Sequence, residues 1–387
     1  MIFLLAFLMN VSTGLLVLSN PLLALQLFRA DAFMLGLLGT VPAIIYALVC
    51  ALSGLWGDRI GPRKVIVIAC LCLLLVYCSI FLVGRFGHLL LLAGFWGLGG
   101  ALFWPAMIRW LGEDEREDRL RHRIGSYNIA LIAGVMVGPP LAGAVFPFNY
   151  RYPYLVAAFL AIVILAILAV AWRRKVRIPE SAPGRPEEEG EKAVPGFIYI
   201  GWAANFATWF AIGACQSLFP ELAKSLPVPI SDRMLGILIA LIPAGEIAVF
   251  AILRKLRHWH YKYRYLFLFQ LLGIGGLLII AFNSAPCLFI PGFLAVGFAG
   301  GMTYFSSIYY SVHRQEGKGR KSGFHESFLG FGVALGPLGG GLAASRLGLR
   351  APYLLAAGIF AASIIIQYYL LRRFAPGEQL PENHQGG

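Results

Sequence analysis

The stretch GSYNIALIAGVMVGPPLAG at residues 125–143 returns later in the chain as GFHESFLGFGVALGPLGGG at residues 323–341. Five glycine or proline positions recur in register, 198 residues apart: 125/323, 134/332, 138/336, 139/337 and 143/341. The similarity continues in RYPYLVAA (151–158) and RAPYLLAA (350–357). Because both copies lie inside long apolar runs, the sequence predicts a duplicated bundle of membrane helices.

The composition supports a membrane protein. Of 387 residues, 59% are hydrophobic and 13% charged, and the mean hydropathy is +0.74. A soluble domain of this composition would expose too much apolar surface. Apolar segments long enough to cross a bilayer of about 30 Å recur along the chain, and strand patterns are absent. We therefore expect an all-α membrane protein with twelve transmembrane helices in two pseudo-symmetric six-helix bundles. The segments begin near Ile2, Phe33, Val65, His88, Ile124, Tyr152, Gly196, Met234, Tyr265, Cys287, Ser322 and Pro352.

The net charge of +13 could suggest a nucleic-acid partner, but its distribution indicates topology instead. If the first helix starts in the cytoplasm, the segments on that side hold 25 of the 32 lysines and arginines. This asymmetry predicts a multi-pass protein of the cytoplasmic (plasma) membrane with both termini in the cytoplasm. No nucleic-acid partner is expected. The six cysteines all fall in apolar segments and are expected to pack rather than to bind metal.

A polar break rich in Pro, Glu and Arg divides the two repeats. It predicts an N-terminal six-helix bundle over 1–172, a cytoplasmic linker over 173–195 and a C-terminal six-helix bundle over 196–373. The last residues, 374–387, are predicted to be a disordered tail.

The segment GLWGDRIGPRK at 54–64 lies between the second and third predicted helices. It resembles the signature loop of the major facilitator superfamily, although Pro62 stands where that family often has a basic residue. The resemblance covers essentially the whole chain and implies a gating motif whose aspartate contacts the other half near 322–326. The alternative to a gating motif is an ordinary turn whose basic residues only set the membrane topology. The matching residues are Gly54, Asp58, Arg59, Gly61, Arg63 and Lys64.

The repeated stretch also resembles the motif associated with exporters of the antiport type in this family, which implies export. Close helix packing is the alternative, because the eleventh predicted helix carries the same pattern. Ala93 stands where many proton-coupled drug exporters have an arginine, which speaks against the usual form of that mechanism. The motif residues of the two helices are Gly125, Gly134, Gly138, Pro139, Gly143, Gly332, Gly336 and Pro337.

Glu246 is the only acidic residue well inside a predicted span. An ionised side chain there costs on the order of 3 kcal/mol or more, so we expect it to face the bundle interior. It is a candidate for proton coupling or for the counter-charge of a cationic substrate. A structural pair with a basic group or with water is the alternative. His325 and Glu326 could relay protons, or could cap their helix and contact headgroups or Arg320.

Polar and aromatic residues suggest a central cavity. The resemblance implies that helices 1, 4, 7 and 10 line it, while packing or interfacial anchoring is the alternative for each aromatic residue. The substrate-cavity candidates are Asn10, Trp104, Asn205, Trp209, Gln216 and Tyr304.

The sequence therefore predicts a secondary active transporter that moves a small organic solute by alternating access, with proton-coupled export (efflux) as the favoured mode. The alternatives are an uptake symporter or facilitator of a polar metabolite, and a non-transporting membrane sensor on the same fold. We expect a monomer in the lipid bilayer, with the solute and protons as partners. No phosphate-binding loop or HExxH pattern occurs, so no enzyme activity, catalytic residue, cofactor or metal is expected.

Overall fold

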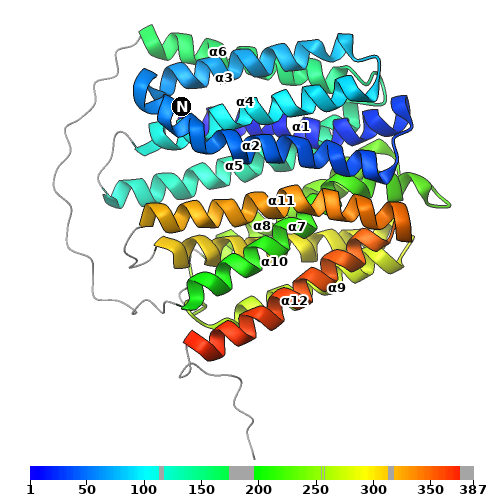
Figure 1. Cartoon of the computed structure of the whole chain (residues 1–387). Helices are drawn as coiled ribbons and strands as arrows, with labels where there is room; N and C mark the ends of the chain where they lie inside the picture. Colours follow the sequence, from blue (N-terminus) through cyan, green and yellow to red (C-terminus); the bar gives the residue numbers. More distant parts are fainter. Residues whose placement is uncertain (113–116, 174–195, 254, 257, 313–317, 375–387) are drawn as a thin grey trace, which may run out of the picture.

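The computed structural model consists of twelve long α-helices and one short 3-10 turn among its described residues (Figure 1). It describes the whole chain except 113–116, 174–195, 254, 257, 313–317 and 375–387. It leaves aside the side chains of 51–60, 112, 117–125, 172–173, 312, 318–320 and 322–323. The elements are α1 (Ile2–Phe28), α2 (Ala32–Ile60), α3 (Pro62–Cys78), η1 (Ser79–Leu82), α4 (Phe86–Gly112), α5 (Glu117–Val145), α6 (Tyr152–Arg173), α7 (Gly196–Ser225), α8 (Asp232–Leu253), α9 (Tyr263–Phe282), α10 (Pro286–Val312), α11 (Lys318–Leu347) and α12 (Ala351–Phe374).

All twelve predicted spans are confirmed as helices that are long and apolar enough to cross a membrane. Two helices begin at least four residues earlier than the apolar pattern predicted. α5 starts at Glu117 instead of Ile124, and α11 starts at Lys318 instead of Ser322. The extra turns are rich in Glu, Arg and Lys, which favour helix but do not register as apolar. The hydrophobic core of each span therefore marks the membrane segment, not the full helix.

The helices α1–α6 form one half of the molecule and α7–α12 the other (Figure 1). The two halves repeat the same packing, since α1 lies on α5 as α7 lies on α11. The crossing of α2 with α4 likewise matches that of α8 with α10. A Cβ on Gly97 would clash with the carbonyl oxygen of Pro42, and one on Gly297 would clash with that of Ile242. The predicted pseudo-symmetric pair of bundles is therefore confirmed.

The two halves meet mainly where α2 packs on α11 and where α5 packs on α8. We call the end of the bundle that holds Met1 and Phe374 the terminal end. The turns 29–31, 146–151, 226–231 and 348–350 lie at the other end, which we call the opposite end. The linker predicted over 173–195 and the tail predicted over 374–387 lie, apart from Arg173 and Phe374, outside the described residues.

Two turns show why particular residues end these helices. Gly61 has φ of +84° between α2 and α3, and Pro62 follows at the first position of α3. Gly348 has φ of +94° directly after α11. Glycine reaches these positive φ values without the strain that a side chain would cause, and proline at a helix start loses no hydrogen bond.

Candidate functional site

The glycines of the repeated motif lie where helices of the same half cross. A Cβ on Gly138 of α5 would lie 2.5 Å from the Cα of Gly14 in α1. A Cβ on Gly336 of α11 would clash with the carbonyl oxygen of Phe210 in α7. The small residues thus let the two backbones touch, as in other tightly crossed membrane helices. Close packing, the structural alternative for this motif, is confirmed for these positions.

The carbonyl oxygens of the prolines of the same motif contact the other half of the molecule. A Cβ on Gly236 of α8 would clash with the carbonyl oxygen of Pro139 in α5. The crossing of α2 with α11 corresponds to this one with the two halves exchanged. There, a Cβ on Gly36 of α2 would lie 2.6 Å from the carbonyl oxygen of Pro337 in α11. We call these two crossings, α5 on α8 and α2 on α11, the seam. At both contacts the glycine backbone lies against a proline carbonyl of the other half, and in the second crossing the Pro337 ring also packs against Gly39 of α2.

Hydrogen bonds reinforce the seam. The Thr40 hydroxyl in α2 donates to the carbonyl oxygen of Ala334 in α11 over 2.8 Å, and both groups are buried. The acceptor lies three residues before Pro337. A buried hydrogen bond of this kind joins the halves directly, and breaking it in a dry seam leaves two polar groups without partners.

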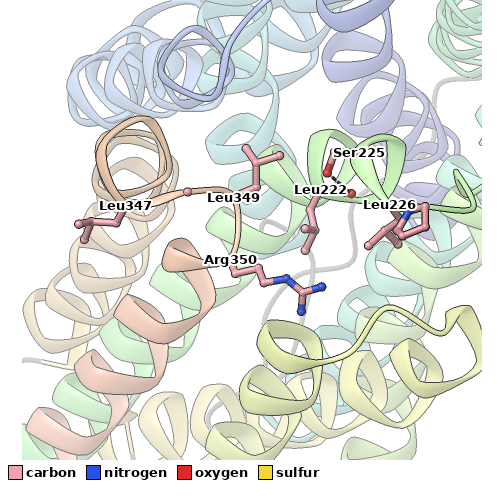
Figure 2. A pocket seen from close by; sticks show the side chains of 8 residues that line it. Leu222, Ser225, Leu226, Leu347, Leu349 and Arg350 are labelled. Carbon is pink, nitrogen blue, oxygen red and sulfur yellow. Dashed lines mark hydrogen bonds between the residues drawn. The ribbon is translucent and has the colours of Figure 1, made fainter.

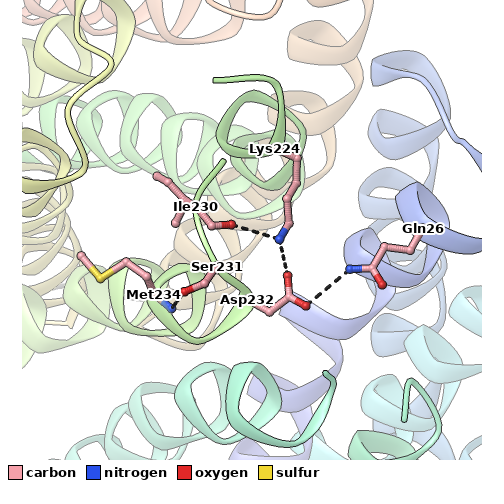
Figure 3. Close-up of polar contacts among 6 residues, drawn as sticks. All are labelled: Gln26, Lys224, Ile230, Ser231, Asp232 and Met234. Carbon is pink, nitrogen blue, oxygen red and sulfur yellow. Dashed lines mark hydrogen bonds and ion pairs between the residues drawn. The ribbon is translucent and has the colours of Figure 1, made fainter. Parts of the chain in front are cut away.

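A polar cluster, which we call the lock, joins the two halves at the opposite end (Figure 3). The Asp232 carboxylate pairs with the Lys224 ammonium at 2.5 Å. The Gln26 amide of α1, from the other half, donates to the same carboxylate over 3.4 Å. The ammonium also donates to the carbonyl oxygen of Ile230 over 3.0 Å. Asp232 is therefore the residue at which α1, α7 and α8 are tied together.

Local sequence explains why this carboxylate is held in place. Ser231 precedes α8 and its hydroxyl accepts a hydrogen bond from the backbone N–H of Met234 over 3.3 Å, as a helix cap does. Asp232 is the first residue of α8, so its negative charge lies at the positive end of the helix dipole. Gly143 of α5 contacts the Asp232 backbone so closely that a Cβ there would clash.

The same end of the molecule has a shallow cavity of about 310 Å³ (Figure 2). Arg350 lines it but donates its guanidinium to the carbonyl oxygens of Ala281 (2.6 Å) and Asn283 (3.1 Å) at the end of α9. These bonds satisfy the last carbonyls of that helix. We therefore assign Arg350 a structural role. The lining residues are Leu222, Ser225, Leu226, Pro227, Leu347, Gly348, Leu349 and Arg350.

Glu246 lies deep inside the C-terminal half, with 7% of its surface exposed. Its Oε1 atom has no hydrogen-bond partner among the described residues. A Cβ on Gly300 of α10 would lie 2.7 Å from that oxygen, so the missing side chain makes room for the carboxyl. The structural alternative, a pair with a basic group, finds no support in the described part of the chain.

Aromatic rings surround this part of α10. The Tyr304 ring stacks on Phe250 of α8 at 5.8 Å between centroids. It meets the edge of Trp209 of α7 at 6.3 Å. The structure therefore brings together two predicted cavity residues, Trp209 and Tyr304. The Trp209 indole N–H has no acceptor among the described residues, which leaves one more polar atom available in this region.

Two roles were predicted for His325, a proton relay or a helix cap near the headgroups, and its position contradicts the second. It lies inside α11 with no exposed surface, and its Nδ1 atom is 2.8 Å from the Ser307 hydroxyl of α10. The idea that this histidine caps its helix or contacts headgroups is therefore wrong. α11 begins seven residues earlier, at Lys318, so position 325 is interior. Glu326, its neighbour, keeps 55% of its side chain exposed.

The other cavity candidates are dispersed. Asn10 is buried and donates its amide to the carbonyl oxygen of Leu131 in α5 over 2.8 Å. Asn205 is fully buried with neither amide atom bonded to a described residue. Trp104 packs against Phe103 at 4.9 Å. Gln216 is partly buried. The substrate role of each stays a prediction.

The predicted gating motif is only partly described. Gly54, Asp58 and Arg59 belong to α2, but their side chains lie outside the described part. Gly61 makes the turn to α3, and the Arg63 guanidinium lies over the Trp110 ring of α4 at 5.1 Å. Lys64 is exposed. The gating role of the motif stays a prediction. Gly125 also lies among the undescribed side chains.

The lock and the partners of His325 could not be predicted from the sequence. Asp232 stands at the start of its predicted span, where an acid is common, so nothing singled it out. The serine directly before it was an available sign of a helix cap, and hence of a fixed carboxylate. No comparable sign pointed to Ser307. Among the described residues, no group of three or more His, Cys, Asp or Glu side chains could hold a metal ion.

Comparison with known proteins finds similarity in sequence and in structure. Multidrug resistance protein 1 of Bacillus subtilis (strain 168) is 23% identical over 179 residues, which is 46% of each chain. A bacterial homolog of the human lysosomal transporter Spinster, inward-facing and unoccupied, matches with a TM-score of 0.73 at 15% identity over 98% of both chains. The nucleoside transporter NupG matches with a TM-score of 0.71 at 12% identity over 97% of this chain and 98% of its own.

The two structures share the fold, and the curated relative is matched over about half its length. The family model for the Major Facilitator Superfamily matches residues 2–315, which is most of the chain. Together with the twelve helices, this match identifies a protein that moves solutes across a membrane. The chain belongs to the Major Facilitator Superfamily of membrane transporters.

Proposed function

We propose that this chain exports a small organic solute in exchange for protons, by alternating access between its two halves. The observation that carries the proposal is Glu246, whose carboxyl is buried in the membrane with an oxygen that no described residue satisfies. Buried intramembrane acids are costly and mark ion or substrate pathways. Protonation removes the charge, and therefore the cost, so one proton changes the energy of the state in which the acid is buried.

The surroundings of Glu246 suit an organic solute. Tyr304, Phe250 and Trp209 offer ring faces and edges within one cluster, and the Trp209 indole offers an N–H. Ligand sites of this kind are mostly apolar with a few placed polar groups. A solute that contacts Trp209 and Tyr304 would displace water from the Glu246 carboxyl or compete with its proton. Binding of the solute would then favour loss of the proton, and this competition produces the exchange of solute for protons.

The seam and the lock provide one of the two gates that alternating access requires. The charge asymmetry of the loops favours an orientation with the terminal end in the cytoplasm. In that orientation the seam closes the outer side of the protein. Export would begin by loading the solute from the cytoplasm in this state and would continue by opening the seam. The partial similarity to a protein named for multidrug resistance supports efflux over uptake.

Proteoliposomes that contain the purified protein and a pH-sensitive dye test the proposal. Cationic, neutral and anionic solutes are presented one at a time across an imposed proton gradient. We expect a solute-dependent proton flux in the wild type and its loss in Glu246→Gln. Asp31→Asn is the matched control, because Asp31 is an exposed acid whose carboxylate accepts a bond from the N–H of Met34 at the start of α2. Solute flux without proton movement would refute coupling.

One observation favours a second function, uptake or facilitated diffusion of a polar metabolite. Asn205 is fully buried in α7, and both its amide atoms are free of described partners. A polar solute could satisfy them by hydrogen bonds. Cells that make the protein would then accumulate the solute, whereas an exporter would deplete it. Asn205→Leu should abolish accumulation in the first case and affect efflux little in the second.

A further inference from the structure

Four titratable side chains of the C-terminal half form a row that leads from the buried acid toward the terminal end. They are Glu246, Tyr304, His325 and Glu326. Glu246 packs against α10 at Gly300. His325 of α11 bonds to α10 at Ser307. These two points are seven residues apart, or about 10 Å along a helix, which is too far for one proton transfer. Something must bridge that distance if a proton is to pass between them.

Tyr304 occupies the gap. Gly300, Tyr304 and Ser307 stand at positions i, i+4 and i+7, so they share one face of α10. The Tyr304 ring meets the imidazole of His325 edge to face at 5.1 Å between centroids. The Tyr304 hydroxyl also interacts electrostatically with both Glu246 and Glu326. A phenol can accept one proton while it gives up another, so it can link two acids without changing its own state.

His325 has one nitrogen committed and one available. Ser307 holds Nδ1 at 2.8 Å, and the Ser307 backbone carbonyl in turn accepts from the Ser311 hydroxyl over 2.8 Å. The Nε2 atom has no hydrogen-bond partner among the described residues, although the ring is fully buried. It lies 3.8 Å from Oε1 of Glu326, a gap that a small side-chain rotation or one water closes.

Glu326 connects this group to the space between the halves. Its side chain is 55% exposed. Its electrostatic neighbours include Tyr46 of α2 and Tyr127 of α5, both from the N-terminal half. An exposed carboxyl with neighbours from both halves faces the space between them and not the lipid. It can therefore exchange protons with water there.

We propose that His325 carries protons between Glu326 and Glu246 through Tyr304, with Ser307 as its positioning residue. This inference rests on the proposed function, since it assigns the route by which Glu246 is loaded. The assigned tautomer has Nδ1–H donated to Ser307 and a lone pair on Nε2. Nε2 takes the proton of the Glu326 carboxyl and passes it to the Tyr304 oxygen, while the phenol proton moves to Glu246. Glu326 ends as the carboxylate and Glu246 as the acid.

The test follows Glu246 by infrared difference spectroscopy after a rapid pH jump, on the full chain in lipid vesicles and without any solute. The protonated-carboxyl band that disappears in Glu246→Gln belongs to Glu246. We expect His325→Gln to slow the rise of this band at least about tenfold and to leave its final amplitude unchanged. Ser307→Ala should slow it less. His88→Gln is the matched control, because His88 is a partly exposed histidine of α4, outside the route.

A second variant separates the relay from a structural role. His325→Ala leaves space that dissolved imidazole can enter, and added imidazole should restore the rate in proportion to its concentration. An unchanged rate in His325→Gln, or no rescue by imidazole, would overturn the relay and leave Glu246 as the coupling acid. A wild-type spectrum with no Glu246 band would refute both the relay and the proposed coupling, so the two failures are distinguishable.

Discussion

Asp232 is the central residue of the lock. Its carboxylate accepts the Gln26 amide from the N-terminal half while Lys224 of its own half neutralises it. The carboxylate is 10% exposed and the lysine 30%, so water screens the pair only in part. Moving α1 away from α8 breaks the bond to Gln26. The lock therefore stabilises the state in which this end is shut.

We predict that Asp232→Ala opens the opposite end more often. The contact that opening breaks is the Gln26 hydrogen bond, and a hydrogen bond contributes about 1 kcal/mol, which corresponds to roughly a fivefold shift in population. Thr40→Cys reports on the opening, because Thr40 is 3% exposed in the seam. In a background without native cysteines, a membrane-impermeant maleimide should label that cysteine up to about fivefold faster. Lys262→Met, an exposed lysine at the terminal end, is the control. Equal labelling rates would show that the lock does not hold this end shut.

At the scale of helices, the seam is built from two repeat-related contacts. Gly236 of α8 meets Pro139 of α5, and Gly36 of α2 meets Pro337 of α11. Proline leaves carbonyls of the preceding turn without their usual helix bonds, and glycine lets another backbone approach. Because each contact joins one helix of each half, a rigid rotation of the halves must separate both crossings together.

We predict that Gly236→Ala prevents the seam from closing fully. The added Cβ would clash with the Pro139 carbonyl, and backbone cannot yield as a flexible side chain does. Labelling of Thr40→Cys at the other crossing should rise as well, since the halves move as units. Gly358→Ala in α12 is the matched control, because a Cβ there meets nothing within 4 Å. A labelling rate like that of the control would show that this crossing is not part of the gate.

The helices themselves were largely predictable, whereas the contacts between them were not. Apolar length and the positions of Gly and Pro give the spans and the two-fold repeat, because the membrane allows little else at that depth. Asp232 and Gln26 are 206 positions apart, and no local pattern says that they meet. His325 looked like a residue near a helix end because its helix begins in polar sequence that the hydropathy pattern does not count.

The candidate site was predictable in part for the same reason. Glu246 stood out because a charge inside an apolar run is costly wherever the helix packs. Trp209 and Tyr304 were expected in the cavity from the family resemblance, and the structure places them beside each other. Asn10 was expected there too; its amide bonds to the α5 backbone, and its place in the cavity stays a prediction. Whether a polar side chain faces a cavity or a neighbouring helix depends on rotation about the helix axis, which the sequence leaves open.

At the scale of the molecule, the contacts between the halves and the buried acid have different roles. The seam and lock close one end, and the buried acid with its route to the other end lies in the C-terminal half. A proton on Glu246 changes the energy of burying that carboxyl, and a ligand or proton can shift two states only by its different affinity for each. Coupling therefore requires that the hydration of Glu246 differs between the two states.

Distances between spin labels at the two ends test alternating access most directly. Phe148→Cys with Val228→Cys spans the halves at the opposite end, where both residues are 72% exposed. Lys64→Cys with Leu256→Cys spans them at the terminal end. We expect two conformations, one with a short distance at the opposite end and a long one at the terminal end, and one with the reverse. A change of pH should shift the populations of these two conformations in the wild type. In Glu246→Gln, the populations should not depend on pH. One fixed distance at each end under all conditions, or both distances growing together, would contradict the account.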